Sequence, residues 1–230
     1  MAPAHPDNAA RRRLILASSS PRRREILQAA GIEFDVVPTA VLEERLPGES
    51  PEQFVCRMAT EKAEAAFERI AYPCAAPVIV PILVPILAPI LGADTVVVLG
   101  NETLGKPDSA EDARRMLRLL SGRQHCVLTG LCLLSPPQPW PSPLSELRRD
   151  VQVASTTVQF AQLTEEEIEE YVASGEPFDK AGGYAIQGLA SKYIEGIQGC
   201  YFNVVGLPIS LVYQILKGLH SALESAQNQR

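Results

Sequence analysis

The chain has 230 residues, of which 46% are hydrophobic and 21% charged, and its formal net charge is −6 at pH 7. This composition is typical of a soluble globular protein, and the acidic balance argues against a general nucleic-acid binder, which carries a positive excess. The five cysteines are scattered without CxxC spacing, so we expect reduced thiols in a cytoplasmic protein rather than disulfides or a zinc site.

A strand followed by a helix begins the predicted fold. Residues 1–13 read as a flexible tail, and residues 13–17 as a short buried strand. Ser20 suits the N-cap of the following helix, Pro21 its first position and Gly31 its end.

The motif SSSPRRR (residues 18–24) places arginines in the first turn of this helix, where the helix dipole prefers negative charge. An anion docked on the free N–H groups and the guanidinium groups would account for them, and phosphate is the usual ligand of such a site. A solvated basic face is the alternative. The motif alone leaves both interpretations open.

An unusual stretch, PVIVPILVPILAPILGADT, occupies residues 77–95, and no charged residue lies between Arg69 and Asp94. That length is sufficient for a transmembrane helix. However, a proline recurs every fourth residue, and each interior proline costs a helix about 3 kcal/mol. Proline also fits poorly in a central strand. We therefore expect no membrane span, with a membrane-anchored protein as the alternative.

The remaining chain alternates between predicted strands and helices, without a clean domain boundary. Besides the segment 32–38, strands are expected at 93–104 (two, joined by a Gly-Asn turn), 125–134, 151–161, 184–188 and 192–197. Helices are expected from the capping box at Ser50 to about Ile70, at 109–120, from the capping box at Thr164 to about Ser174, and at 208–223. This alternation predicts one bilobed α/β domain.

Two further motifs carry candidate site residues. Asp94 in GADT lies at the expected end of a buried strand, where it could hold a metal or activate water, or only cap a turn. Lys106 in LGKP could return beside it, although such lysines are usually solvated. In FDKAGGYAIQG (residues 178–188), Gly182 and Gly183 would permit a close approach of the backbone to a ligand.

Gln187, in the same motif, offers one acceptor and two donors, which suits a uracil or thymine edge; a surface position on a strand is the alternative. Asp179 and Lys180 would otherwise form a local ion pair. None of the three histidines is placed for catalysis, which weighs against a Ser-His or Cys-His nucleophile.

In this order, the motifs resemble the Maf family of nucleoside triphosphate pyrophosphatases. The matching text is LILASSSPRRREIL, EKAEAA, GADTVV, LGKP, RMLRLLSGRQHCVLTG, SGEPFDKAGGYAIQG and NVVGLPIS. The resemblance implies a mixed, twisted sheet flanked by helices, with a central cleft as in Maf and Ham1 proteins, and a homodimer. It also implies release of pyrophosphate from a nucleoside triphosphate, with Mg²⁺, or alternatively Mn²⁺ or Co²⁺, as the cation.

The resemblance further implies roles for particular residues. Asp94 would be the general base, and Lys62 and Lys106 would be catalytic cations facing the phosphates. Glu43 or Glu44, together with Asp94, would hold the metal. The substrate-binding and specificity residues would be Ser18, Arg22, Arg23, Thr95 and Gln187.

The sequence YAIQG resembles the branch of the family acting on dTTP and UTP, and modified pyrimidine triphosphates fit the same interpretation. A 7-methyl-GTP pyrophosphatase and a non-catalytic nucleotide-binding module are the alternatives. The catalytic domain would span residues 14–223, with a proline-repeat insert at 77–91, a proline-rich loop at 135–150 and a tail at 224–230. Either PVIV or the last repeat copy would supply the strand that leads to Asp94.

Overall fold

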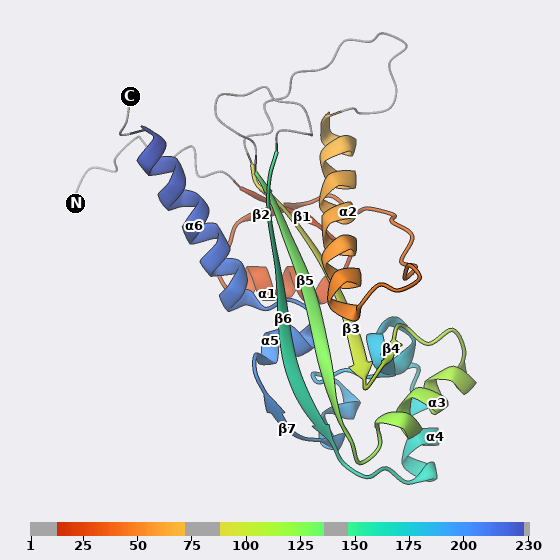
Figure 1. The fold of residues 1–230 in the computed structure, drawn as a ribbon. Helices are drawn as coiled ribbons and strands as arrows, with labels where there is room; N and C mark the ends of the chain where they lie inside the picture. Colours follow the sequence, from red (N-terminus) through yellow and green to blue (C-terminus); the bar gives the residue numbers. More distant parts are fainter. Residues whose placement is uncertain (1–12, 72–87, 136–146, 228–230) are drawn as a thin grey trace, which may run out of the picture.

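The computed structural model describes residues 13–71, 88–135 and 147–227. A mixed seven-stranded sheet forms its centre, in the order β2-β1-β3-β5-β6-β7, with β4 paired to β3 (Figure 1). β1 is parallel to β2 and β3, and all other pairs are antiparallel. The strands are β1 (Leu14–Ala17), β2 (Phe34–Val36), β3 (Ile90–Leu99), β4 (Glu102–Leu104), β5 (Gln124–Ser135), β6 (Arg148–Phe160) and β7 (Ile194–Gln198). The predicted α/β class is confirmed.

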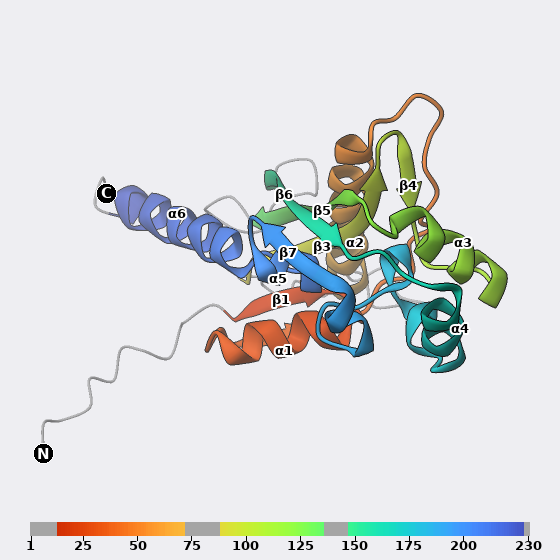
Figure 2. The same cartoon turned by 90° about the horizontal axis from the view of Figure 1, so that it is seen from below.

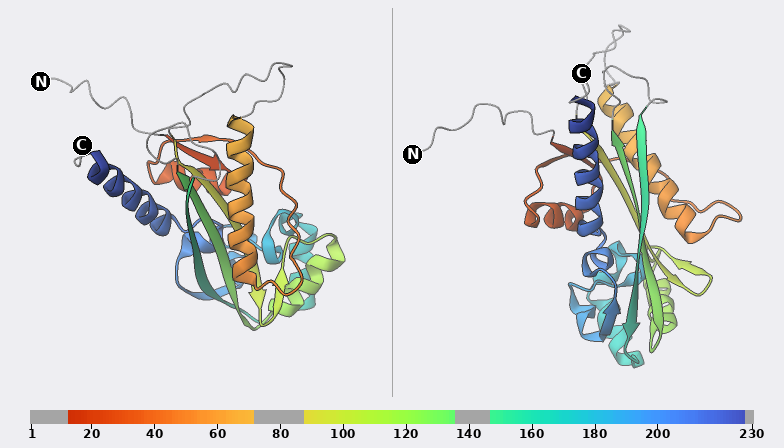
Figure 3. Two further views of the ribbon diagram at one scale, coloured as in Figure 1. Left: turned by 45° about the horizontal axis from the view of Figure 1, so that its top comes forward. Right: turned by 60° about the vertical axis from the view of Figure 1, so that its left-hand side comes forward.

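The helices divide between the two faces and one end of the sheet. They are α1 (Pro21–Ala29), α2 (Pro51–Ala71), α3 (Ala110–Leu120), α4 (Glu165–Ala173), α5 (Tyr201–Val205) and α6 (Ile209–Gln227), with 3-10 helices at Glu176–Asp179, Ala181–Gly183 and Leu189–Tyr193. Figure 2 shows α3 and α4 together at the end of the molecule opposite α6. Figure 3 shows α2 on one face of the sheet and α1 and α6 on the other.

Separate apolar clusters define two lobes. In one lobe, α1 and α6 pack on Leu131 and Leu133 from one side of β5, and α2 packs on Cys132 and Leu134 from the other. In the other lobe, α3 and α4 pack around Phe160 and its neighbours. The long strands β3, β5 and β6 run through both lobes, so the molecule is one bilobed domain.

Glycines allow α2 to lie unusually close to the sheet. A Cβ atom on Gly92 would lie 1.9 Å from the carbonyl oxygen of Ala59, and one on Gly130 would lie 2.2 Å from that of Val55. Both distances are far inside van der Waals contact, so these positions of β3 and β5 exclude a side chain. This close approach brings the polar residues of α2 against β3.

Two helices begin as their caps predict. Ser50 and Gln53 exchange hydrogen bonds of 2.9 and 3.2 Å before α2, and Thr164 and Glu167 form the same capping box before α4. Ser20 occupies the N-cap of α1, but its side chain makes no capping hydrogen bond. The predicted N-cap position is confirmed, and the first turn of α1 keeps its N–H groups free of a cap from this side chain.

The last proline-repeat copy supplies the start of β3. Ile90 and Leu91 pair with Ile15 and Leu16 of β1, so the strand begins before the predicted position 93, and the predicted insert 77–91 extends too far. An apolar copy placed beside the apolar β1 can join the sheet without exposing side chains. Residues 77–87 of the insert lie outside the described residues.

Other predicted boundaries also need correction. Of the predicted loop 135–150, Ser135 belongs to β5 and residues 148–150 belong to β6, because the two strands pair to their ends; residues 136–146 lie outside the described residues. α6 continues to Gln227, so the predicted tail is shorter. The segment 184–188 forms a turn rather than a strand, and the short α5 was not predicted.

No helix among the described residues is long and apolar enough to cross a membrane. The charge-free stretch that raised this question lies partly in 72–87, outside them.

Candidate active site

A cavity of about 880 Å³ lies where the lobes meet. Its walls come from the β1–α1 connection, the segment 37–50, α2, β3, the β4–α3 connection, residues 178–187 and the end of α5. β3 explains its position, because the edge of this strand pairs with β1 over residues 90–92 and with β4 over residues 97–99. Between these two stretches, the edge of β3 pairs with neither β1 nor β4. The predicted site residues Asp94 and Thr95 lie there. The expected cleft is confirmed.

Lys62 joins two carboxylates on one wall of the cavity. Its Nζ donates hydrogen bonds of 2.5 Å to Glu43 Oε1 and 2.6 Å to Asp94 Oδ1. The side chains of Lys62 and Asp94 are 9% and 8% exposed, whereas that of Glu43 is 42% exposed. Both carboxylates therefore converge on one ammonium group at the edge of the protein interior.

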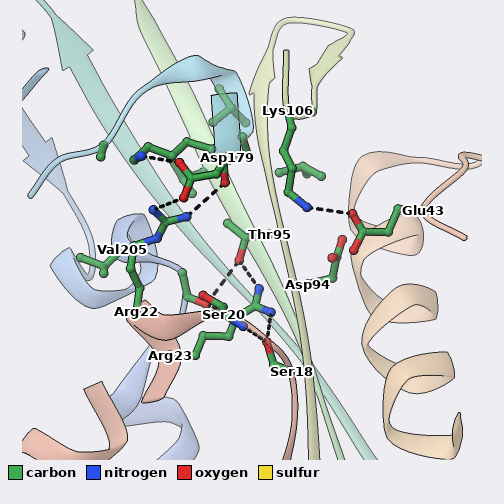
Figure 4. Close-up of a pocket in the computed structure, with 18 of the residues that line it drawn as sticks. Ser18, Ser20, Arg22, Arg23, Glu43, Asp94, Thr95, Lys106, Asp179 and Val205 are labelled. Carbon is green, nitrogen blue, oxygen red and sulfur yellow. Dashed lines mark hydrogen bonds and ion pairs between the residues drawn. The ribbon is translucent and has the colours of Figure 1, made fainter. Parts of the chain in front are cut away.

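Lys106 completes this wall from the solvent side. Its Nζ lies 3.6 Å from Glu43 Oε2, and its side chain is largely exposed (Figure 4). Burial raises the pKa of Glu43, but the hydrogen bond from Lys62 and the charges of Lys62 and Lys106 outweigh it and lower this pKa below its ordinary value. Glu43 is consequently an anion at neutral pH. The predicted group of Asp94, Lys62 and Lys106 is brought together.

Asp94 reaches this position from the middle of β3, not from the strand end that the sequence predicted. It shares the α2 face of the sheet with Gly92, whose missing side chain allows α2 to approach. Lys62 lies on the apolar face of α2 beside Ala59 and Ala63. A lysine on an otherwise apolar helix face must find a buried anion, and Asp94 is that anion.

Glu43 and Glu44 differ in their position relative to the cavity. Glu43 lines the cavity, whereas Glu44 does not, and the backbone carbonyl of Glu44 accepts a hydrogen bond from Arg57. The described residues contain no group of three or more metal-ligating side chains. Of the predicted metal ligands, only Glu43 and Asp94 come together.

Arg23 is buried and holds three segments together. Its guanidinium donates to Ser18 Oγ and Ala93 O at 3.0 and 2.9 Å, to Gly206 O at 2.9 Å and to Thr95 Oγ1 at 3.1 Å. Burial lowers its pKa, against the opposing charges of nearby carboxylates. Four of its five N–H donors are used within the protein, so Arg23 fixes the positions of the residues around it.

Arg22 points away from the Arg23 network, toward Asp179. It lies 3.5 Å from the carboxylate of Asp179 and donates to the carbonyl of the same residue at 3.3 Å (Figure 4). Asp179 also pairs with Lys180, which confirms the predicted local ion pair. Burial raises the pKa of Asp179, but the hydrogen bond and charge of Lys180 together with the charge of Arg22 outweigh it and lower this pKa below its ordinary value. Arg22 is thus the more accessible of the two arginines.

Ser18 and Thr95 line the cavity and also belong to the network around Arg23. Ser18 Oγ accepts from the N–H of Ser20 at 3.2 Å. Thr95 Oγ1 lies 2.9 Å from Thr129 Oγ1 and 3.4 Å from Gly206 O. Both hydroxyl groups are therefore held in fixed positions at the cavity wall.

Gln187 lies in a turn at the cavity wall, and its side chain forms no hydrogen bond with another described residue. It is exposed, as expected of a residue that reads a ligand or of an ordinary surface residue. Gly182 and Gly183 do not line the cavity, so the predicted close approach to a ligand is wrong. Both have φ of +68°, and a Cβ atom on Gly182 would lie 2.8 Å from Val97, which explains why both are glycine.

A buried contact between His125 and Tyr184 was not predicted from the sequence. His125 Nε2 lies 2.7 Å from the hydroxyl of Tyr184, and burial lowers the pKa of this histidine to about 4. His125 is thus buried in the core and neutral at neutral pH. Its position on an apolar strand was the feature of the sequence that indicated this burial.

Comparison with known proteins places this site in a family. The family model described as "Maf-like protein" matches residues 13–219, which contain every residue of the cavity. The chain belongs to the Maf family. It is 43% identical over 209 residues to a dTTP/UTP pyrophosphatase of Syntrophus aciditrophicus (strain SB), covering 91% of each chain.

Other relatives carry the same name at similar identity. A dTTP/UTP pyrophosphatase of Anaeromyxobacter dehalogenans (strain 2CP-C) is 46% identical over 206 residues, covering 89% of this chain and 93% of the relative. One from Geobacillus sp. (strain WCH70) is 43% identical, covering 90% and 98%. Among solved structures, the Staphylococcus aureus Ham1 protein aligns over 89% of this chain and 98% of its own, with 13% identity and a TM-score of 0.45.

Proposed function

We propose that this Maf protein hydrolyses dTTP and UTP, and modified pyrimidine triphosphates of the same shape, to the monophosphate and pyrophosphate. The convergence of Glu43 and Asp94 on Lys62 is the observation that carries the proposal, because it supplies a base and fixed charges at one wall of a nucleotide-sized cavity. The names of the relatives support the choice of substrate.

The side chains divide the reaction between them. Asp94, held by Lys62, accepts the proton of a water molecule whose oxygen attacks the α-phosphorus. The bond to the β-phosphate oxygen breaks, and pyrophosphate leaves with the electron pair. Arg22 and Lys106 line the cavity, where their charges can stabilise the phosphate oxygens. The network around Arg23 keeps this wall rigid.

A divalent cation fits the two carboxylates. Glu43 and Asp94 are hard oxygen donors that Lys62 brings close together, and Mg²⁺ is usually held by one or two carboxylates together with substrate phosphates. When bound, such a cation would neutralise phosphate charge and lower the pKa of a bound water. We propose Mg²⁺, with Mn²⁺ or Co²⁺ as alternatives.

Gln187 is the proposed reader of the base. Its free acceptor and donors, at the cavity wall, can match the carbonyl and imide edge that uracil and thymine share. Thr95 and Arg22 would set the position of the substrate between the two walls. A 7-methyl-GTP pyrophosphatase would instead need to fit a purine here.

A panel of nucleoside triphosphates, assayed for pyrophosphate release with Mg²⁺, Mn²⁺ and Co²⁺, tests the proposal. We expect dTTP and UTP to be turned over faster than CTP, GTP, ATP and 7-methyl-GTP. Faster turnover of a purine triphosphate would refute the substrate assignment. Binding of UTP without any pyrophosphate release would favour the non-catalytic nucleotide-binding module.

We also propose a homodimer in the cytoplasm, on the strength of family resemblance. Light scattering of the purified full-length chain at micromolar concentration tests the dimer, and a monomer mass would refute it. Fractionation of cells expressing the full chain tests the location, and recovery in the membrane fraction would favour the membrane-anchored alternative.

A further inference from the structure

Glu43 lies on a segment without regular secondary structure. Residues 37–50 connect β2 to α2, and the structure assigns no helix or strand to them (Figure 1). A catalytic carboxylate must nevertheless stay within a fraction of an ångström of its working position. Because Glu43 is itself 42% exposed, other contacts must hold the segment.

Arg57 of α2 makes such contacts at two points of the segment, Glu44 and Glu49. Its Nη2 donates to the carbonyl of Glu44 at 2.8 Å, directly after Glu43 in the chain. Its Nε and Nη2 donate to the two carboxylate oxygens of Glu49 at 2.7 and 2.8 Å, and its Nη1 donates to Glu61 at 3.0 Å. The planar guanidinium of Arg57 thus binds the segment at both Glu44 and Glu49.

Glu49 also forms hydrogen bonds within the segment. The side chain is 9% exposed, and its Oε2 also accepts from the N–H of Leu46 at 3.0 Å. Its backbone carbonyl accepts from Arg45 Nε at 2.7 Å, and Arg45 also reaches Thr103 of β4 at 3.2 Å. The hydrogen bond from Arg57 is the main reason why the pKa of Glu49 is lowered to about 2. The carboxylate therefore keeps its charge throughout the neutral range.

We propose that Arg57 and Glu49 form a positioning pair that sets Glu43 opposite Asp94. Lys62, which bonds both carboxylates, lies five positions after Arg57 on the same helix. α2 therefore fixes the lysine directly and the Glu43 segment through Arg57. The prediction of an effect on turnover rests on the proposed function, whereas the prediction about the segment itself does not.

Arg57→Lys and Glu49→Gln test the pair. Lysine keeps the charge but cannot form the fork to Glu49 together with the bond to Glu44. We expect kcat for pyrophosphate release from UTP to fall about 10-fold or more, as for other displaced catalytic groups, with a smaller change in KM. Arg114→Lys is the matched control, because Arg114 forms a comparable two-bond pair with Glu169 away from the cavity. It should leave kcat unchanged.

A double-mutant cycle separates positioning from general stability. If Arg57 acts through Glu43, then Arg57→Lys should change kcat less than about twofold in a Glu43→Gln background, where its target is already lost. Equal losses of kcat in both backgrounds would overturn the proposal. So would an unchanged kcat in both Arg57→Lys and Glu49→Gln.

Trypsin supplies a readout that needs no substrate. Cleavage after Arg45, followed by mass spectrometry, should be faster in Arg57→Lys and Glu49→Gln than in the parent and in Arg114→Lys. Equal cleavage rates would overturn the proposal even if the parent releases pyrophosphate from none of the triphosphates. In that case the proposed function fails separately, and faster cleavage would still support the positioning of the segment.

Discussion

The wall of the cavity formed by α2 and β3 buries its charged groups and pairs them, whereas the wall formed by Arg22 and residues 178–187 leaves its polar groups more open. Lys62 and Asp94 are less than a tenth exposed and bonded to each other. Across the cavity, Asp179 is 67% exposed, and Gln187 forms no side-chain hydrogen bond with another described residue. One wall is a helix packed on a sheet, whereas the other combines the first turn of α1 with short 3-10 helices and a turn.

Buried and open walls suit different tasks. A proton acceptor needs a fixed position relative to the reacting atoms, and a buried network provides it. A substrate-reading residue needs free donors and acceptors, which a paired residue has lost. The neighbours Arg22 and Arg23 reproduce this division within a single helical turn, and each prediction below tests one side of it.

Asp94→Asn should have the largest effect on the buried wall. Asparagine cannot accept the proton, so we expect kcat for UTP to fall by roughly 10²–10⁴-fold. Nucleotide binding, measured by calorimetry, should change far less. A variant that retains most of its turnover would show that another group is the base.

Glu43→Gln and Glu44→Gln compare two adjacent carboxylates. We expect a loss of kcat of about 10- to 100-fold for Glu43→Gln, in the range seen when groups that support a metal site are removed. Glu44→Gln should change kcat less than twofold, because only the backbone of Glu44 contacts the network. Equal effects in the pyrophosphate assay would refute the assignment of Glu43.

Arg23→Lys and Arg22→Lys should separate stability from binding. Lysine cannot replace the four hydrogen bonds of Arg23, so we expect the free energy of unfolding in urea to fall by about 2 kcal/mol or more. Arg22→Lys should change it by less than about 0.5 kcal/mol, as for other accessible residues.

The kinetic effects of these two variants complete the comparison. Arg22→Lys should raise KM for UTP about 10-fold, the equivalent of losing one charge-assisted hydrogen bond to phosphate. If Arg22→Lys destabilises the protein and Arg23→Lys does not, the division between the two arginines is wrong.

Gln187→Ala tests the open wall with a smaller effect. Loss of one neutral hydrogen bond to the base should raise KM for UTP about fivefold, with no change in thermal unfolding. Gln214→Ala, an exposed glutamine of α6 outside the cavity, is the matched control. An unchanged KM in Gln187→Ala would favour the alternative that this glutamine is an ordinary surface residue.

Deletion of Pro81–Leu91 should have the smallest effect. It joins Val80 to Gly92, so that Ile79 and Val80 replace Ile90 and Leu91 beside β1. Apolar character is kept at both positions, and we expect turnover and thermal stability close to those of the parent. An unfolded, inactive deletion variant would refute the view that the additional copies are a tandem expansion without a role in the site.

Much of the fold was predictable because its signals are local. The capping boxes at Ser50 and Thr164, and the Gly-Asn turn after β3, specify element ends through contacts within a few residues. Strand ends were less predictable: β5 and β6 extend into the expected loop because each supplies the pairing partner of the other. The site residues came from family resemblance, and the sequence left Glu43 and Glu44 unresolved.

The sequence by itself determined the class of fold, the order of most elements and the presence of acidic and basic residues in a recognisable order. It also indicated that Arg23 would be buried, although this indication was not used. Arg23 lies three and four positions before the buried Ile26 and Leu27 and therefore on the apolar face of α1. Only the tertiary structure decided which carboxylate meets Lys62 and which arginine remains accessible. The reason is that these outcomes depend on how closely α2 approaches the sheet at Gly92, a contact between residues far apart in the chain.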